Sequence, residues 1–292
     1  MRVLVTGASG QVGTDLVRWF AGATSYEVVA ADHGRLDVGD RDAVRAAAAG
    51  VAPSIIVHAA AWTAVDDCEA DPDRAWRVNA LGTRHVAEAA ASVGAHLVYL
   101  STDYVFDGTL ERPYHEWDAP NPRSVYGASK LAGEREVMVL APGAAIVRTS
   151  WVCGVHGDNM VKTVLRVAAK EKDLAFVDDQ RGCPTFADDL ARAVVELAVG
   201  RRPGTFHVTN QGATTWYQFA RDVVSAAGRD PAMVHPITTA ELSPPRLAPR
   251  PANSVLDNAA LRGSDLPLLP DHRDALVRTV RTLMGAKQGA RP

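Results

Sequence analysis

Short apolar runs alternate along this chain with stretches in which apolar residues recur at helical spacing. Residues 2–6 are apolar and rich in β-branched side chains, which predicts a buried strand. Val12, Leu16 and Phe20 follow at intervals of four residues, which predicts an amphipathic helix. Further strands are expected at residues 27–31, 54–57, 95–100 and 144–149, with a helix at 42–49. Strands that alternate with helices predict an α/β fold with a doubly wound parallel sheet.

A glycine-rich turn joins the first strand to the first helix. Gly7, Gly10 and Gly13 follow the pattern G-x-x-G-x-x-G, with Gln11 and Val12 where the helix opens. Glycine lets the backbone approach a ligand closely, and the N-terminus of a helix attracts a diphosphate. Between a strand and a helix, this turn favours a dinucleotide site over an ordinary tight connection.

The second predicted strand ends where the adenosine of such a cofactor would lie. A carboxylate such as Asp32 accepts hydrogen bonds from the ribose hydroxyls and repels a 2′-phosphate. His33 and Arg35 follow at once, however, and a cation there could bind that phosphate, so NADH and NADPH both stay open. Asp37 and Val38 are candidates for holding adenine through a carboxylate and a backbone amide, with a solvated loop as the alternative.

Tyr126 and Lys130 are the candidates for proton transfer. They are four residues apart on a predicted helix, so the phenol and the ammonium share one face. A nearby cation favours the phenolate, and we expect it to lower the pKa of Tyr126 from about 10 and make it a usable proton donor. The preceding strand ends in Ser101-Thr102, which favours catalysis over surface chemistry for this pair. His58, at another strand end, is more typical of a packed residue than of a base.

Composition excludes several classes of protein. The chain has 292 residues, a 47% hydrophobic content and a net charge of −3, which suits a full core and argues against a nucleic-acid surface or a polybasic membrane face. No apolar run reaches transmembrane length, and the first residues lack a signal-type segment. The three cysteines fit no metal spacing and suit a reducing compartment, so we expect a cytoplasmic protein.

Several longer motifs stand at the ends of the predicted strands and in the loops. They are GASGQVG (7–13), AAAWTAVD (59–66), STDYVFDG (101–108), YGASKLAGE (126–134), RTSWV (148–152), DQRGCPT (179–185) and RPANS (250–254). Together they resemble the dTDP-4-dehydrorhamnose reductase family of the extended short-chain dehydrogenase/reductase superfamily, over nearly the whole chain. The related 4,6-dehydratases follow their Thr with an Asp-Glu pair; here Tyr104 follows Asp103, which disfavours dehydration.

The resemblance implies a role for each matching residue. Thr102, Tyr126 and Lys130 would be the catalytic set, with Asn79 supporting Lys130 through water. Tyr126 and Lys130 would also bind the cofactor, with Lys130 holding the nicotinamide ribose. The small side chains of Ala59, Ala60 and Ala61 would leave room for the cofactor beside the glycine turn. The residues implied for substrate binding are Thr63, Val65, Thr102, Asp103, Tyr104, Trp151, Gln180, Pro184 and Arg250. Among these, Trp151 suits a sugar face and Arg250 could grip a diphosphate through two hydrogen bonds.

The same resemblance, together with the predicted elements, divides the chain into two parts. We expect a Rossmann domain at residues 1–150, which also takes in about 186–208. A smaller, mostly helical sugar-nucleotide lobe is expected at residues 151–185 and 209–292. Within this second half, helices are expected at 159–169, from 184 to 200 and at 271–284.

The implied activity is reduction of the C4 ketone of a dTDP-4-keto-6-deoxyhexose, with dTDP-4-dehydro-L-rhamnose as the expected substrate. NADPH is the favoured cofactor and NADH the alternative. Two other functions stay open: a ketoreductase for another nucleotide sugar, and a non-catalytic NADP-binding subunit like the regulatory partner of methionine adenosyltransferase. A monomer, a homodimer and a magnesium requirement are all compatible with the sequence.

Overall fold

A six-stranded parallel sheet forms the centre of the protein in the computed structural model, which describes residues 1–23 and 25–288. The strands run in the order β10-β5-β4-β3-β1-β2. They are β1 (Arg2–Thr6), β2 (Glu27–Ala31), β3 (Ile55–His58), β4 (His96–Thr102), β5 (Ala145–Thr149) and β10 (Gly204–His207). The strand order changes direction between β1 and β3, so the carboxyl ends of these strands flank the crevice where such sheets bind ligands.

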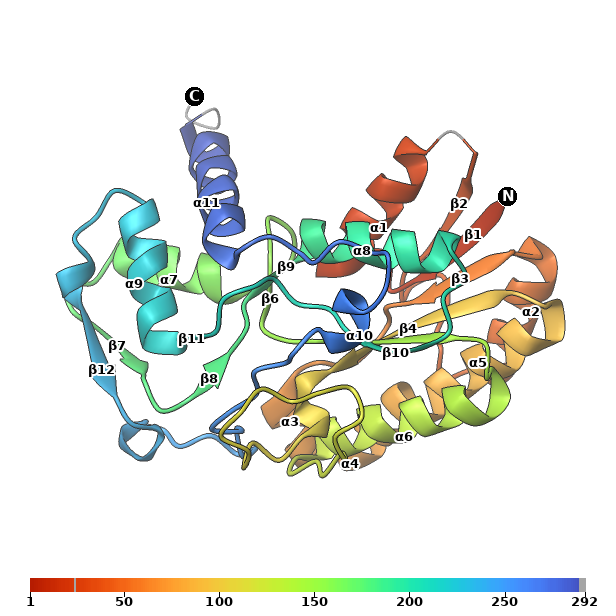
Figure 1. The fold of residues 1–292 in the computed structure, drawn as a ribbon, viewed down its shortest axis with the longest axis horizontal. Coiled ribbons are helices and arrows are strands. Elements are labelled where there is room, and N and C mark those ends of the chain that lie inside the picture. The colour runs from red at the N-terminus through yellow and green to blue at the C-terminus, as the bar shows by residue number, and fades with distance from the viewer. Residues whose placement is uncertain (24, 289–292) are drawn as a thin grey trace.

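Helices cover both faces of this sheet (Figure 1). One face carries α1 (Gln11–Gly22) and α8 (Ala187–Val199), which pack side by side. The other face carries α2 (Arg41–Val51), α5 (Gly82–Val93) and α6 (Val125–Leu140). Two separate apolar clusters join the strands to these two layers, which explains why the strands read as continuous apolar runs. The predicted doubly wound fold is confirmed.

A second group of elements lies to one side of the sheet (Figure 1). Its longer helices are α7 (Met160–Ala168), α9 (Trp216–Ala226) and α11 (His272–Gln288). Its short strands pair as β6 (Val152–Cys153) with β9 (Thr185–Phe186), β7 (Leu174–Val177) with β12 (Val234–Ile237), and β8 (Arg181–Gly182) with β11 (Thr214–Thr215). Buried residues that include Val164, Phe219 and Leu276 give this lobe an apolar core of its own.

Shorter helical segments lie between these elements. They are α3 (Val65–Ala70), α4 (Pro72–Ala75), η1 (Trp76–Leu81), η2 (Asp103–Val105), η3 (Pro231–Met233), η4 (Thr239–Glu241) and α10 (Ala259–Arg262). The first of the η segments, η1, is a π-helical turn that runs directly into α5. The helix expected from residue 184 begins at Ala187 instead, because Thr185 and Phe186 pair with β6.

Two residues fix where α6 begins. Ser124 is its N-cap, and the Ser124 hydroxyl accepts a hydrogen bond from the backbone N–H of Gly127 at 3.1 Å. Gly127 allows a close approach to η2, because a Cβ at this position would lie 2.2 Å from the carbonyl oxygen of Tyr104. The first turn of α6 is therefore held against the chain that leaves β4.

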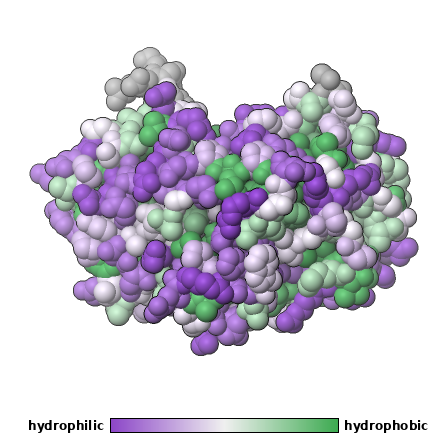
Figure 2. All heavy atoms as spheres, in the orientation of Figure 1, coloured by the Kyte–Doolittle hydropathy of each residue, from purple (hydrophilic) through white to green (hydrophobic). Residues whose placement is uncertain are grey.

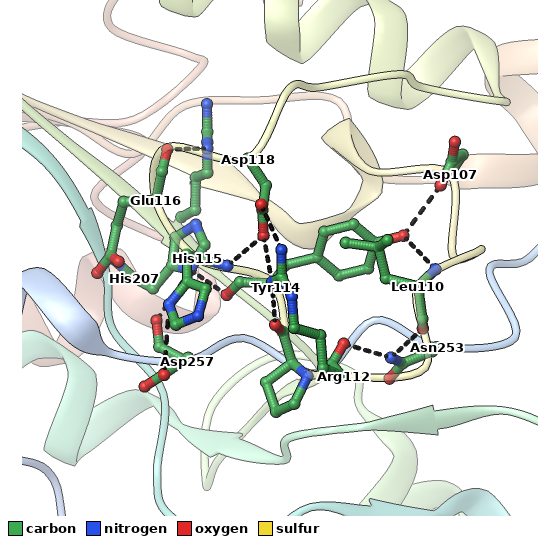
Figure 3. Close-up of polar contacts among 12 residues, drawn as sticks. Asp107, Leu110, Arg112, Tyr114, His115, Glu116, Asp118, His207, Asn253 and Asp257 are labelled. Carbon is green, nitrogen blue, oxygen red and sulfur yellow. Dashed lines mark hydrogen bonds and ion pairs between the residues drawn. The ribbon is translucent and has the colours of Figure 1, made fainter.

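Polar contacts fix the long loop between β4 and α6 (Figure 3). Asn253 donates through Nδ2 to the carbonyl oxygens of Leu110, at 2.7 Å, and Arg112, at 3.0 Å. Arg112 also makes a two-point ion pair with Asp118, with both N–O distances at 2.7 Å. Asn253, which belongs to the RPANS motif (250–254), therefore ties this loop to that segment.

The surface mixes polar and apolar residues. On the face seen in Figure 2, polar residues predominate and apolar residues form small groups among them. Among the described residues, no helix combines the length and the apolar character needed to cross a membrane.

Candidate active site

A cavity of about 390 Å³ lies at the carboxyl ends of the central strands. It joins the glycine turn to the proposed catalytic side chains, and its lining includes Gly7, Gly10, Gln11, Val12, Gly13, Thr102, Tyr126 and Lys130. Parallel strands bring their carboxyl ends to one edge of the sheet, so residues far apart in the sequence meet there. The structure therefore brings the predicted glycine turn and the predicted catalytic set to one site.

A second cavity, of about 250 Å³, continues from the first over the glycine turn. The two share Gly7, Gly10, Ala59 and Ala61, and the second also reaches His33, Asp37, Val38 and Ala60. The turn packs tightly here: a Cβ on Gly7 would lie 2.6 Å from the backbone nitrogen of Ala60, and Gly7 has a φ of +68°. The two cavities and the glycine turn have the form of a dinucleotide site, with room for a nicotinamide at one end and an adenosine at the other.

Not every predicted adenosine contact faces this second cavity. His33 lines it, whereas Asp32 and Arg35 do not line it among the described residues. The Asp32 carboxylate accepts a hydrogen bond from the backbone N–H of Arg35 at 3.0 Å, and the Arg35 guanidinium points to the carbonyl oxygen of Ala30 at 3.5 Å. In this structure His33, rather than Arg35, is the predicted cation that faces the adenosine end.

Asp37 and Arg74 complete the adenosine end. The Asp37 carboxylate accepts hydrogen bonds from Arg77 at 3.0 Å and from the backbone of Gly39 at 2.9 Å, and these hold the pKa of Asp37 below its usual value. Arg74, which the sequence did not single out, also lines this cavity, with its guanidinium 4.4 Å from the ring centroid of Trp62. The second cavity thus carries His33 and Arg74 beside a fixed carboxylate.

Tyr126 and Lys130 lie one turn apart at the start of α6, as predicted. The Lys130 ammonium donates to the carbonyl oxygen of Leu100 at 2.7 Å and lies 4.2 Å from the ring centroid of Tyr99. The Thr102 hydroxyl caps η2 by accepting a hydrogen bond from the backbone of Tyr104 at 3.2 Å. Thr102 ends β4 and Tyr126 opens α6, so both hydroxyl groups can reach one ligand atom in the cavity.

The expectation that Lys130 lowers the pKa of Tyr126 is wrong for this structure. Burial raises the pKa of the Tyr126 phenol well above its usual value, and a hydrogen bond with Thr102 opposes this only in part. Burial also lowers the pKa of Lys130 to about 7, although the nearby Glu134 carboxylate acts in the opposite direction. Desolvation therefore dominates both groups, because each is enclosed by protein and the ammonium is directed at a backbone carbonyl.

Asn79 sits in the π-helical turn η1 and is fully buried. Its Oδ1 accepts from the backbone N–H of Trp62 at 2.8 Å, and its Nδ2 donates to the Trp62 carbonyl and to the Ser129 hydroxyl, each at 3.1 Å. These bonds tie the loop after β3 to α6 next to Lys130. Support of Lys130 by Asn79 through water stays a prediction.

Most of the predicted substrate residues line the main cavity. Those that do are Thr63, Val65, Thr102, Asp103, Tyr104 and Trp151. Burial raises the pKa of Asp103 to about 6, and its Oδ2 atom has no hydrogen-bond partner among the described residues. Gln180 and Pro184 are buried away from the cavity lining, and Gln180 donates instead to the hydroxyl of Thr239 at 2.8 Å.

Arg250 lies in a third cavity, of about 260 Å³, which shares Tyr104 with the main one. Its guanidinium makes a two-point ion pair with Asp66, at 2.8 and 3.0 Å, and also donates to the carbonyl oxygen of Ala248 at 2.8 Å. The Arg250 guanidinium, which was predicted to bind a diphosphate through two hydrogen bonds, is therefore paired with Asp66 of the AAAWTAVD motif. The sequence did not reveal this partner, although the motif contains it.

A buried ion pair behind the catalytic helix was also missed. Glu134 of α6 accepts two hydrogen bonds from Arg148 of β5, at 2.9 and 2.7 Å, and a third from the Ser101 hydroxyl of β4 at 2.5 Å. Both charged side chains are almost wholly buried. The pair connects α6, which carries Tyr126 and Lys130, to the two neighbouring strands. Glu134, Arg148 and Ser101 stand in three of the family motifs, which is the signal that could have suggested a shared role.

Comparison with known proteins agrees with this geometry. The family model described as the RmlD substrate binding domain matches residues 1–284. A dTDP-4-dehydrorhamnose reductase from Streptomyces griseus is 43% identical over 290 residues, which covers 97% of this chain and 94% of that protein. A Streptomyces antibioticus protein named as a probable dTDP-4,6-dihydroxy-2-methyloxan-3-one 4-ketoreductase is also 43% identical and covers 98% of this chain and 97% of its own.

Solved structures agree as well. The crystal structure of dTDP-4-dehydrorhamnose reductase from Bacillus anthracis in complex with NADP has a TM-score of 0.92 and 38% identity to this chain. That match covers 96% of this chain and 99% of the other. The motifs, the fold and these relatives agree, and the chain belongs to the dTDP-4-dehydrorhamnose reductase family.

Proposed function

We propose that this protein reduces the C4 ketone of a dTDP-4-keto-6-deoxyhexose with NADPH, and that its substrate is dTDP-4-dehydro-L-rhamnose. The observation that carries the proposal is the meeting of Thr102, Tyr126 and Lys130 in one cavity that continues over the glycine turn. The names of the relatives, and the NADP held by one of them, support the same chemistry.

The residues of the two cavities fit a nicotinamide dinucleotide. Gly7, Gly10 and Gly13 keep the backbone free of side chains where a diphosphate would lie, and the N-terminus of α1 opens beside them. His33 faces the adenosine end and would favour the 2′-phosphate of NADPH. The bound cofactor supplies a hydride to C4 of the sugar.

Tyr126 would protonate the oxygen at C4 as negative charge develops there. Because burial raises its pKa, the phenol keeps its proton at neutral pH and is available as a donor. Thr102 would donate a second hydrogen bond to the same oxygen, and the positive charge of Lys130 would stabilise the phenolate left behind. Groups that stabilise charge present only in the transition state accelerate the reaction rather than merely bind substrate.

The sugar nucleotide would occupy the main cavity and the neighbouring third one. Trp151 would offer its indole to the sugar. Arg250 would exchange part of its ion pair with Asp66 for the diphosphate. We assign the cofactor to the Rossmann domain of residues 1–150 with about 186–208. The lobe of residues 151–185 and 209–292 would complete the sugar-nucleotide site beside the substrate residues of that domain.

The same site could serve another keto-sugar nucleotide. The Streptomyces antibioticus relative is as similar in sequence as the rhamnose enzyme from Streptomyces griseus. A non-catalytic NADP-binding subunit fits less well, since such a protein has no need for the complete catalytic set. Three buried thiols also fit a reducing compartment, which supports the cytoplasm as its location.

Turnover of a panel of dTDP-4-keto sugars with NADPH and NADH tests the proposal directly. Tyr126→Phe should keep cofactor binding and lose roughly 10²–10⁴-fold in kcat, the usual contribution of a general acid. Thr102→Val should lose less, because it removes one hydrogen bond and leaves the proton donor. Near-normal turnover by Tyr126→Phe, or no turnover of any keto-sugar by the wild-type protein, would overturn the proposed function.

A further inference from the structure

Trp151 has an unusual backbone conformation for a large residue. It lies two residues after the end of β5 and directly before β6, its φ is +47°, and it lines the main cavity. A bulky side chain rarely occupies this left-handed region, because its Cβ crowds the following peptide. Such a conformation persists where the surrounding structure imposes it, and it often marks a functional position.

One neighbour of the Trp151 indole is Trp216, the first residue of α9. The two indoles are stacked, with ring centroids 3.5 Å apart and planes within 7°. Trp216 packs in turn against Phe219 at 6.1 Å, and Phe219 is fully buried in the core of the lobe. Among the described residues, Trp151 lines the main cavity and Trp216 does not, so Trp216 supports the indole without facing the cavity.

Gly182 is the second neighbour. A Cβ at this position would lie 2.4 Å from Cε2 of Trp151, so no other amino acid fits without displacing the indole. Gly182 belongs to β8 and is paired with Thr214 of β11, two residues before Trp216. Both neighbours of the indole therefore come from one small sheet of the lobe and the helix that follows it. The backbone of Trp151 is fixed as well, because its carbonyl oxygen accepts from the N–H of Thr185 at 3.2 Å.

We propose that Trp216 and Gly182 are positioning residues that hold the Trp151 indole in place as a wall of the sugar site. This inference rests on the proposed function, since it concerns how the keto-sugar is bound. It makes binding of the sugar depend on the placement of the lobe, because the residues that orient the indole belong to the lobe. The hydride and proton transfers themselves do not involve these two residues.

Three variants, Trp151→Ala as a reference variant, and one control test this inference. Trp216→Ala removes the stacked ring, and Trp216→Phe keeps a flat ring there. Gly182→Ala adds a methyl group that should displace the Trp151 indole. Trp117→Phe is the matched control, because Trp117 is 71% exposed and lies outside the lining of the main cavity. The measurements are the KM for dTDP-4-dehydro-L-rhamnose, the KM for NADPH, kcat, and the near-ultraviolet circular dichroism of the indoles.

Trp216→Ala and Gly182→Ala should each raise the KM for the keto-sugar up to about tenfold, the size expected for loss of one aromatic contact. The KM for NADPH should stay unchanged, because neither residue lines the adenosine or glycine-turn part of the site. Trp216→Phe should recover most of the loss. Trp216→Ala and Trp151→Ala should remove the same circular dichroism band, which a merely structural role for Trp216 would not require.

The wild-type protein could turn over the keto-sugar while the folded Trp216→Ala and Gly182→Ala variants keep an unchanged KM for it. That result would overturn this inference and leave the proposed function intact. Equal increases in the KM for NADPH and for the sugar would also overturn it, since they would indicate a general loosening of the lobe. Absence of turnover in the wild-type protein would instead refute the proposed function.

Discussion

Replacing Glu134 with Gln should destabilise the protein strongly and slow catalysis, although Glu134 touches no ligand site. The Glu134 and Arg148 side chains are 1% and 6% exposed and share two hydrogen bonds. The substitution leaves the Arg148 guanidinium buried without a counter-charge. Removing one partner of a buried pair costs about 3–5 kcal/mol, a large part of the ~5–15 kcal/mol that stabilises a typical domain. A fall in Tm on the order of 10 °C would follow.

Catalysis should respond because Glu134 lies on the helix that carries Tyr126 and Lys130. Loss of the tether to β4 and β5 loosens the placement of both groups, so kcat should fall while the protein is still folded. The charge of Glu134 also opposes the effect of burial on Lys130. Without it, the pKa of Lys130 should move further below its present value of about 7, which would shift the pH–rate profile towards acid.

Glu136→Gln is the matched control, two residues further along the same helix. Glu136 pairs with Arg84 at 3.0 Å, but these side chains are 33% and 45% exposed, so the pair is worth at most about 1 kcal/mol. Urea unfolding, thermal melting and kcat would be measured for both variants. Equal, small losses in the two would refute the reasoning. A Glu134→Gln/Arg148→Met double variant should recover much of the stability, because removal of both charges is often neutral.

Other contacts give further expectations. His33→Ala should raise the KM for NADPH more than the KM for NADH, while Arg35→Ala should change neither. Steady-state kinetics with both cofactors tests this. A raised KM for NADPH in Arg35→Ala but not in His33→Ala would assign the 2′-phosphate to Arg35 instead. Arg250→Lys should raise the KM for the keto-sugar about ten- to a hundredfold through loss of a charged hydrogen bond, and an unchanged KM would leave Arg250 paired only with Asp66. The folded-state pKa of Lys130 is lowered from 10.5 to about 7, so the folded protein binds fewer protons between these values and its free energy of unfolding should gain from rising pH there. In urea titrations over this pH range, Lys130→Met should lack that gain in the free energy of unfolding. The same dependence on pH in Lys130→Met and in the wild-type protein would contradict this prediction.

The sheet and its main helices were predictable because their signals are local. Residues 27–31 and 95–100 are apolar apart from Glu27 and His96, and they became β2 and most of β4. Thr215 is a typical N-cap residue at the start of α9, and its hydroxyl accepts a hydrogen bond from the backbone N–H of Gln218 at 3.2 Å. The strand pairs of the lobe were not foreseen. β6, β8, β9 and β11 have two residues each, which is too short for any periodicity to appear.

The composition of the site was predictable where topology alone brings residues together. Thr102 stands at the end of β4 and the glycine turn at the end of β1, and parallel strands bring such ends to one edge. Long-range side-chain pairs were not predictable in this way. Arg250 and Asp66 are 184 positions apart, and nothing in either segment indicates that they meet. His58 was expected to be a packed residue, and it is fully buried beside the hydroxyls of Thr6 and Thr83.

The sequence does not reveal how deeply a side chain is buried, and burial changes the pKa values expected for Tyr126 and Lys130. Spacing placed a cation near the phenol and suggested a lowered pKa for Tyr126, but enclosure of both groups raises the pKa of Tyr126 and lowers that of Lys130 to about 7. Tyr126 therefore keeps its proton across the neutral range, and it is Lys130 whose charge changes there. We therefore expect activity to fall as the pH rises, first through Lys130 rather than through Tyr126, because a neutral amine no longer stabilises the phenolate that proton donation leaves behind.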